Sequence, residues 1–151
     1  MVTHHRIPND VKEAARRGLA LKAAGYAGGT PTGWGRAKQL IRNSHLDTGT
    51  LAVMRAWYAR HGPDAKNGGT SYRGYRKWVD HGRPSNGAGR QTYRGAVAWL
   101  IWGGDAAYRW LKTDEIRGAL SSAHPKRRPS ARSNNLRRSG RSLRAAPPRR
   151  R

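Results

Sequence analysis

The composition of the last 31 residues restricts any folded domain to the part of the chain before them. Between Ser121 and Arg151 the sequence holds eleven basic residues and four prolines, with no acidic and no aromatic residue. A segment of this composition cannot bury enough apolar surface to offset the entropy cost of ordering it. We therefore predict a disordered arginine-rich tail over 121–151, preceded by an N-terminal extension over 1–8 and a folded domain over 9–120.

Hydrophobic periodicity predicts that the folded domain is mainly helical. Asn9 or Asp10 can cap a first helix, and Asp10 and Glu13 have capping-box spacing ahead of apolar residues at helical intervals. Gly25 is expected to end this helix. The segment 30–33 is predicted to form a turn and a cap, and the apolar stripe that follows it predicts a second short helix.

Two further helices are predicted in the middle of the chain. Asp47 or Thr48 precedes apolar residues spaced three or four apart, and Gly62 gives the expected stop. Residues 72–79 carry aromatic residues at the same spacing and indicate a brief helix. The segment between this helix and residue 94 is rich in glycine and favours a loop.

A tight corner is predicted near the end of the domain. Residues 94–102 are apolar nearly all round, and Gly103 and Gly104 then break the chain. Asp105 follows directly, where a role as the cap of a last helix is favoured over a role as a general base. No alternating strand pattern of useful length is present. We predict a small, mainly α domain of about five or six short helices.

Several functional classes are not indicated. The chain has no cysteine, its six histidines have no recognised ligand spacing, and its eight carboxylates have no nucleophile beside a base. The most apolar run, residues 95–103, is less than half of the roughly 20 residues that cross a bilayer, and the N-terminus has no apolar signal core. We expect no enzyme activity, cofactor, metal, small-molecule substrate or membrane contact.

The charge of the chain predicts an acidic partner. Its 31 basic and 8 acidic residues give a net charge of +23, and the part before residue 121 alone carries +12. Arginine forks suit phosphate, so we expect a nucleic acid, in particular double-stranded DNA, bound by phosphate neutralisation. The expected contacts are Arg73, Arg76 and Lys77 in the domain, and Lys126, Arg127, Arg128, Arg132, Arg137, Arg138, Arg141, Arg144, Arg149, Arg150 and Arg151 in the tail.

The aromatic residues are all Trp or Tyr, and many lie next to arginine. The segment 72–78 leaves two alternatives open: Tyr72, Tyr75 and Trp78 either pack in the core or stack on unpaired bases with support from neighbouring cations. The remaining tryptophans recur at helical spacing and are expected in the core. They are Trp34, Trp57, Trp99, Trp102 and Trp110.

The glycine-rich segment 28–33 invites comparison with a phosphate-binding loop, because backbone amides at a helix start can hold an anion. A Walker loop needs lysine and a hydroxyl residue directly after its last glycine. Trp34 and Gly35 stand there instead, and no apolar strand precedes the segment. A turn or a general phosphate contact is favoured over a nucleotide site.

Five segments together resemble a small uncharacterised module found in tailed phages and large DNA viruses of algae. The resemblance covers about 9–111, and its most specific motif is the Trp-rich run that closes in Gly-Gly-Asp-Ala. The arginine- and glycine-rich stretch 67–90 differs from the shorter, more acidic link of the family. The segments are 10–19, 28–30, 36–40, 54–61 and 98–106. The resemblance implies a viral origin and a place in the virion, with no known catalytic residues.

These observations lead to one main hypothesis and two alternatives. In the main hypothesis the chain is a virion-associated protein that binds packaged viral DNA non-specifically at the inner surface of the capsid, with DNA and capsid proteins as partners. It would be found in the virion and in the infected host cell during assembly. The alternatives are a minor capsid protein that cements capsid subunits without touching nucleic acid, and an RNA-binding protein of the ribosomal type.

Overall fold

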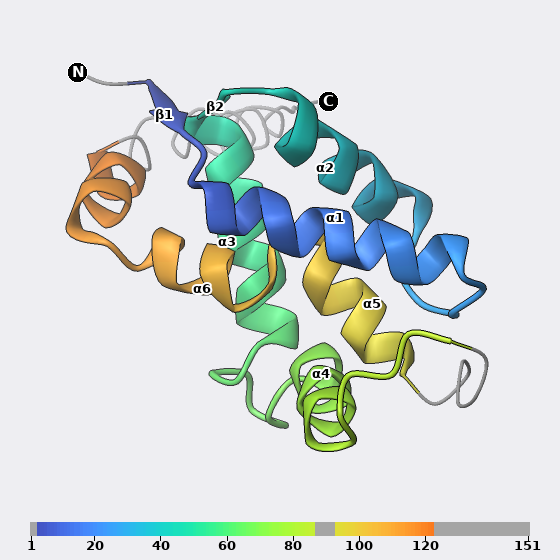
Figure 1. The fold of residues 1–151 in the computed structure, drawn as a ribbon. Coiled ribbons are helices and arrows are strands. Elements are labelled where there is room, and N and C mark those ends of the chain that lie inside the picture. Colours follow the sequence, from blue (N-terminus) through green and yellow to red (C-terminus); the bar gives the residue numbers. More distant parts are fainter. Residues whose placement is uncertain (1–2, 87–92, 123–151) are drawn as a thin grey trace, which may run out of the picture.

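A computed structural model describes residues 3–86 and 93–122 of the chain (Figure 1). The domain is mainly helical, as predicted, with one or two helices more than expected and a short pair of strands. A seventh helix covers 114–122. The other elements are β1 (His4–Arg6), α1 (Asn9–Ala23), α2 (Pro31–Arg42), β2 (His45–Asp47), α3 (Thr48–His61), α4 (Thr70–Asp80), α5 (Arg94–Ile101) and α6 (Gly104–Leu111).

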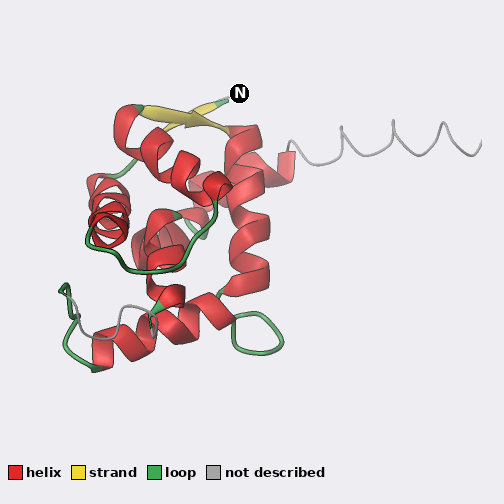
Figure 2. Ribbon diagram, turned by 90° about the vertical axis from the view of Figure 1, so that its right-hand side faces the viewer, coloured by secondary structure: helices red, strands yellow, loops and turns green. Residues whose placement is uncertain are grey.

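The first strand belongs to the fold, although the sequence indicated only an extension over 1–8. β1 pairs antiparallel with β2, and His5 lies opposite Leu46 (Figure 2). His5 is 2 % exposed, with Nδ1 3.2 Å from a carboxylate oxygen of Glu115 and Nε2 3.2 Å from the hydroxyl of Thr48. The start of the chain is therefore tied to α3 and to the seventh helix. Strands of three residues are too short to show an alternating pattern.

Helix α5 lies at the centre of the described fold, which explains why its sequence is apolar nearly all round. It packs against α1, α2, α4 and α6, and five of its eight residues are buried. Figure 1 shows α5 between α1 and α4. Helix α1 approaches closely at Gly18, where a methyl group would lie 2.7 Å from Cγ2 of Ile101. Such contact distances leave no room for a side chain at this crossing.

Helix α2 begins at Pro31, inside the segment 30–33 that it was predicted to follow, and α3 begins after Asp47, one of its two predicted caps. The predicted start of α1 is wrong. The Thr30 side chain accepts a hydrogen bond from the amide of Gly33, and the Asp47 carboxylate accepts one from Thr50. Helix α1 instead begins after Pro8, without a side-chain cap. Neither Asn9 nor Asp10 caps it, because both already lie inside its first turn.

The expected capping box is absent as well. Glu13 forms an ion pair with Arg16 at 2.7 Å instead of reaching back to the helix start. The predicted end of α1 holds: Gly25 takes a left-handed φ of 94°, and its amide donates to the carbonyl of Lys22.

The predicted cap of α6 is also wrong. Gly103 takes the cap position with a left-handed φ of 111°, which places Asp105 inside the first turn. The Asp105 carboxylate accepts a hydrogen bond of 3.0 Å from the indole Nε1 of the fully buried Trp99. The buried Tyr58 hydroxyl, 3.1 Å and 2.9 Å from the carbonyl oxygens of Trp102 and Gly104, closes the same corner.

Four of the five tryptophans expected in the core are buried there: Trp57, Trp99, Trp102 and Trp110. The Trp57 and Trp102 rings stack at a centroid distance of 4.9 Å. Trp34 is only half-buried and packs beneath the ammonium group of Lys22, 4.2 Å from the ring centroid. Trp34 thus lies at the edge of the core, whereas Ala37 and Leu40 of the same stripe are fully buried.

Candidate nucleic-acid interface

Helix α4 buries two of its three aromatic side chains and exposes its basic ones. Trp78 is 1 % exposed and Tyr75 is 9 % exposed, and the half-buried Tyr72 packs edge-on against Trp99 at 5.0 Å. The aromatic residues recur every three or four positions, so they share one helix face, and that face points into the core. The alternative of base stacking is therefore not supported for Tyr75 and Trp78, whose rings are covered.

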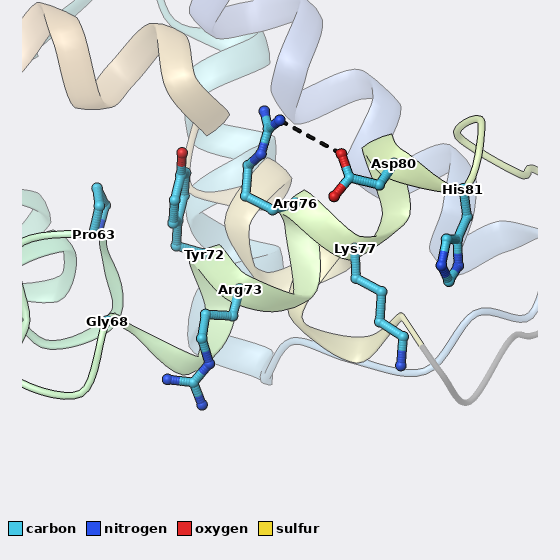
Figure 3. Close-up of a pocket in the computed structure, with 8 residues that line it drawn as sticks. All are labelled: Pro63, Gly68, Tyr72, Arg73, Arg76, Lys77, Asp80 and His81. Carbon is cyan, nitrogen blue, oxygen red and sulfur yellow. Dashed lines mark ion pairs between the residues drawn. The ribbon is translucent and has the colours of Figure 1, made fainter.

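The opposite face of α4 carries the cations predicted to bind nucleic acid. Arg73, Arg76 and Lys77 are all exposed and lie three or four residues apart along the helix. They line a shallow hollow of about 510 Å³ (Figure 3). Its other lining residues are Pro63, Gly68, Tyr72, Asp80 and His81. The structure thus brings the three domain residues of the predicted set together.

The charges of the residues that line this hollow sum to a positive value. Arg76 lies 3.6 Å from the carboxylate of Asp80, on the side of α4 where Tyr72 also extends (Figure 3). Arg73 and Lys77 extend to the other side, and Arg73 donates to the backbone carbonyl of Asn67. Within the described residues neither Arg73 nor Lys77 forms an ion pair. Asp80 therefore pairs with Arg76 alone, and Arg73 and Lys77 keep charges that no carboxylate of the described residues neutralises.

A second polar cluster joins α6 to the loop after α3, and it was not predicted. The Asp64 carboxylate accepts hydrogen bonds from the Tyr108 hydroxyl at 2.6 Å and from the Lys112 ammonium at 3.0 Å. These hydrogen bonds lower the pKa of Asp64 below its ordinary value. The partners are far apart in sequence, so no local spacing indicated the cluster. Its charges pair with one another, which favours a role in holding α6 in place.

The glycine-rich segment before α2 forms a turn and a cap. Gly28 and Gly29 have φ of 129° and 79°, and a methyl group on Gly28 would lie 2.3 Å from the carbonyl oxygen of Arg94. The Gly33 amide at the start of α2 already donates a hydrogen bond to the Thr30 hydroxyl. This geometry agrees with the turn favoured from the sequence.

Other site types find little support in the part of the chain that the structure describes. Residues 3–86 and 93–122 contain no group of three or more His, Asp or Glu side chains placed to hold a metal ion. None of the helices in those ranges has the length and apolar character needed to cross a membrane. The eleven tail cations predicted as contacts, from Lys126 to Arg151, lie outside the described residues.

Comparison of the chain with family models, curated proteins and solved structures finds no match. The resemblance to a module of phages and algal viruses therefore stays a prediction from the sequence.

Proposed function

We propose that this chain binds double-stranded DNA without sequence preference, by neutralising phosphates with the basic face of α4 and the arginine-rich tail. The observation that carries the proposal is the division of α4 into a buried aromatic face and an exposed face with Arg73, Arg76 and Lys77. The core fixes the helix, so its cations are presented on a rigid element. Phosphate contacts of this kind release condensed counterions and give affinity that depends steeply on salt.

The burial of Tyr75 and Trp78 favours duplex over single-stranded DNA. Proteins that bind single strands combine a basic groove with exposed rings on which bases stack. Tyr75 and Trp78 have rings inside the core instead. Arginine and lysine contacts to phosphates hold a duplex in place without reading base edges, so we expect little discrimination between sequences.

The proposed setting is a virion, where the protein would contact packaged DNA at the inner surface of the capsid. The support for this setting is the resemblance of the sequence to a viral module. Affinity that does not depend on sequence suits a protein that must bind any stretch of a packaged genome. No contact seen in the domain favours the capsid-cement or ribosomal-type alternatives over DNA.

The proposal is tested by removing the three α4 cations together. Arg73→Ala, Arg76→Ala and Lys77→Ala in one variant should weaken duplex binding and flatten its dependence on salt by about two to three units of slope. A matched control removes the same charge from exposed residues of other elements: Lys38, Arg42 and Arg117. Equal affinity losses in both variants at every salt concentration would mean that net charge alone acts and α4 has no special role.

A further inference from the structure

Arg83, just after α4, has an unusual backbone conformation. Its φ is 53°, and no other residue with a side chain has a positive φ within 3–86 and 93–122. Trp78 holds this conformation from two sides: its carbonyl accepts from the Arg83 amide at 2.9 Å, and its indole Nε1 donates to the Pro84 carbonyl at 2.8 Å. Outliers that the surrounding structure maintains occur preferentially at functional sites.

The loop that carries Arg83 is fixed against the body of the domain. The buried Tyr26 donates its hydroxyl hydrogen to the carbonyl of Asn86 at 2.8 Å. Together with the two Trp78 hydrogen bonds, this contact holds both ends of the segment 83–86. The Arg83 side chain therefore starts from a defined position.

A second arginine reaches the same place from α1. Arg17 lies over the Trp78 ring, with its guanidinium carbon 6.0 Å from the centroid. Arg17 and Arg83 line a hollow of about 320 Å³, separate from the one on the outer face of α4. Its other lining residues are Ala20, Leu21, Trp78 and Ser85.

The charges of this hollow are unbalanced. Both arginines are exposed, and in the described part of the chain neither takes part in an ion pair. No carboxylate lines the hollow, whereas Ser85 adds a hydroxyl to its edge. Two guanidinium groups and a hydroxyl over an apolar floor are donors suited to a tetrahedral anion with several oxygen acceptors.

We propose that Arg17, Arg83 and Ser85 form a phosphate-binding site between α1 and the loop after α4. Its assignment to a phosphate of the DNA backbone rests on the proposed function and extends that interface beyond α4. The site itself does not depend on that function, since free phosphate offers the same oxygen atoms. Arg83 is the residue that the fold holds in place for this contact.

The test uses two variants of the full chain and one control. Arg83→Gly removes the guanidinium and suits the positive φ, so the fold should be retained. Arg17→Gln removes the second guanidinium, and Arg16→Gln is its control, because Arg16 directly precedes Arg17 on α1 and pairs with Glu13. We expect Arg83→Gly and Arg17→Gln each to flatten the slope of log K against log salt on duplex DNA by about 0.9, the value for one phosphate.

A second measurement separates the site from the proposed function. Inorganic phosphate should shift the NMR signal of the Trp78 indole N–H saturably in the wild type and in Arg16→Gln, but not in Arg83→Gly. If the wild type gives this shift without binding DNA, the site is supported and the proposed function is wrong. If the wild type gives the shift but Arg83→Gly and Arg17→Gln leave the salt slope on DNA unchanged, the site is supported and is assigned to free phosphate. Absence of the shift in the wild type would overturn the site, whatever the DNA result.

Discussion

Gly74 of α4 and Gly95 of α5 meet where the two helices cross. A methyl group placed on Gly74 would lie 2.8 Å from the Cα of Gly95, and one placed on Gly95 would lie 2.9 Å from the carbonyl oxygen of Ser71. The two backbones thus touch directly. This contact seats the aromatic face of α4 on the central helix, and it leaves the basic face outside.

The first prediction concerns this crossing. Gly74→Ala should destabilise the domain by about 1–3 kcal/mol, because the added methyl group meets backbone that cannot move away cheaply. Gly35→Ala is the control: Gly35 lies within α2 with nothing near its missing Cβ, so alanine should stabilise by roughly 0.5–1 kcal/mol through helix propensity. Urea unfolding measures both. Stabilisation by Gly74→Ala would mean that the helices do not approach as described.

A second prediction concerns the hydrogen bond between Trp99 and Asp105. Asp105→Ala leaves a buried indole N–H without its acceptor and should cost about 1–3 kcal/mol. Asp105→Asn keeps a carbonyl oxygen and should cost less. Asp10→Ala removes an exposed first-turn acid of α1 and should change stability by only a few tenths of a kcal/mol. Similar losses for Asp105→Ala and Asp10→Ala in chemical unfolding would argue against the indole contact.

The structural features that depend on neighbouring residues could be predicted from the sequence. Those that depend on residues far apart in the chain could not. A cap within 30–33 and a cap at Asp47 or Thr48 could be predicted, because the Thr30 and Asp47 side chains each accept a hydrogen bond from an amide three residues ahead. Asp105 was assigned wrongly because the left-handed Gly103 moved the helix start, and because its true partner, Trp99, lies across a corner. The strand pair was missed because β1 and β2 are far apart in the sequence and form hydrogen bonds with each other only in the folded chain.

The candidate sites divide in the same way. Arg73, Arg76 and Lys77 could be proposed from local composition, and their grouping on one face follows from helical spacing. The orientation of the Tyr75 and Trp78 face could not be decided locally, because an aromatic stripe fits either a core or a stacking surface. The meeting of Arg17 with Arg83 depends on how α1 lies against the end of α4, which no spacing in the sequence reveals.

A third prediction concerns pH. Hydrogen bonds from Thr50 lower the pKa of Asp47 below its ordinary value of 3.8. The folded-state pKa is therefore depressed, so the charged cap contributes stability that is present above the unfolded pKa and lost as pH falls through the folded one. Asp47→Ala should cost about 1 kcal/mol at pH 6 and less near pH 2. Asp47→Asn, which caps without titrating, should lose stability less steeply below pH 4, and parallel pH profiles for wild type and Asp47→Asn would contradict this account.

A fourth prediction concerns the tail. The seventh helix runs to residue 122, and its Ile116 and Leu120 are buried in the core. A chain that ends at residue 122 should therefore keep the helical circular dichroism signal and the cooperative unfolding of the full chain. A chain that ends at residue 112 removes both buried residues and should unfold more easily. Loss of helical signal in the longer of these two chains would show that the tail is needed for folding.

The most direct test of the central claim, that many phosphate contacts provide the affinity, is the salt dependence of duplex binding. For about six neutralised phosphates, log K should fall against log salt with a slope of roughly −5, and scrambling the DNA sequence should change little. The chain that ends at residue 122 should give a flatter slope, since it lacks the eleven basic residues from Lys126 onward. Fluorescence anisotropy on duplex oligomers measures these slopes. We expect a steep, sequence-independent slope. An affinity that does not change with salt, or no binding at low salt, would rule out phosphate neutralisation as the source of the affinity.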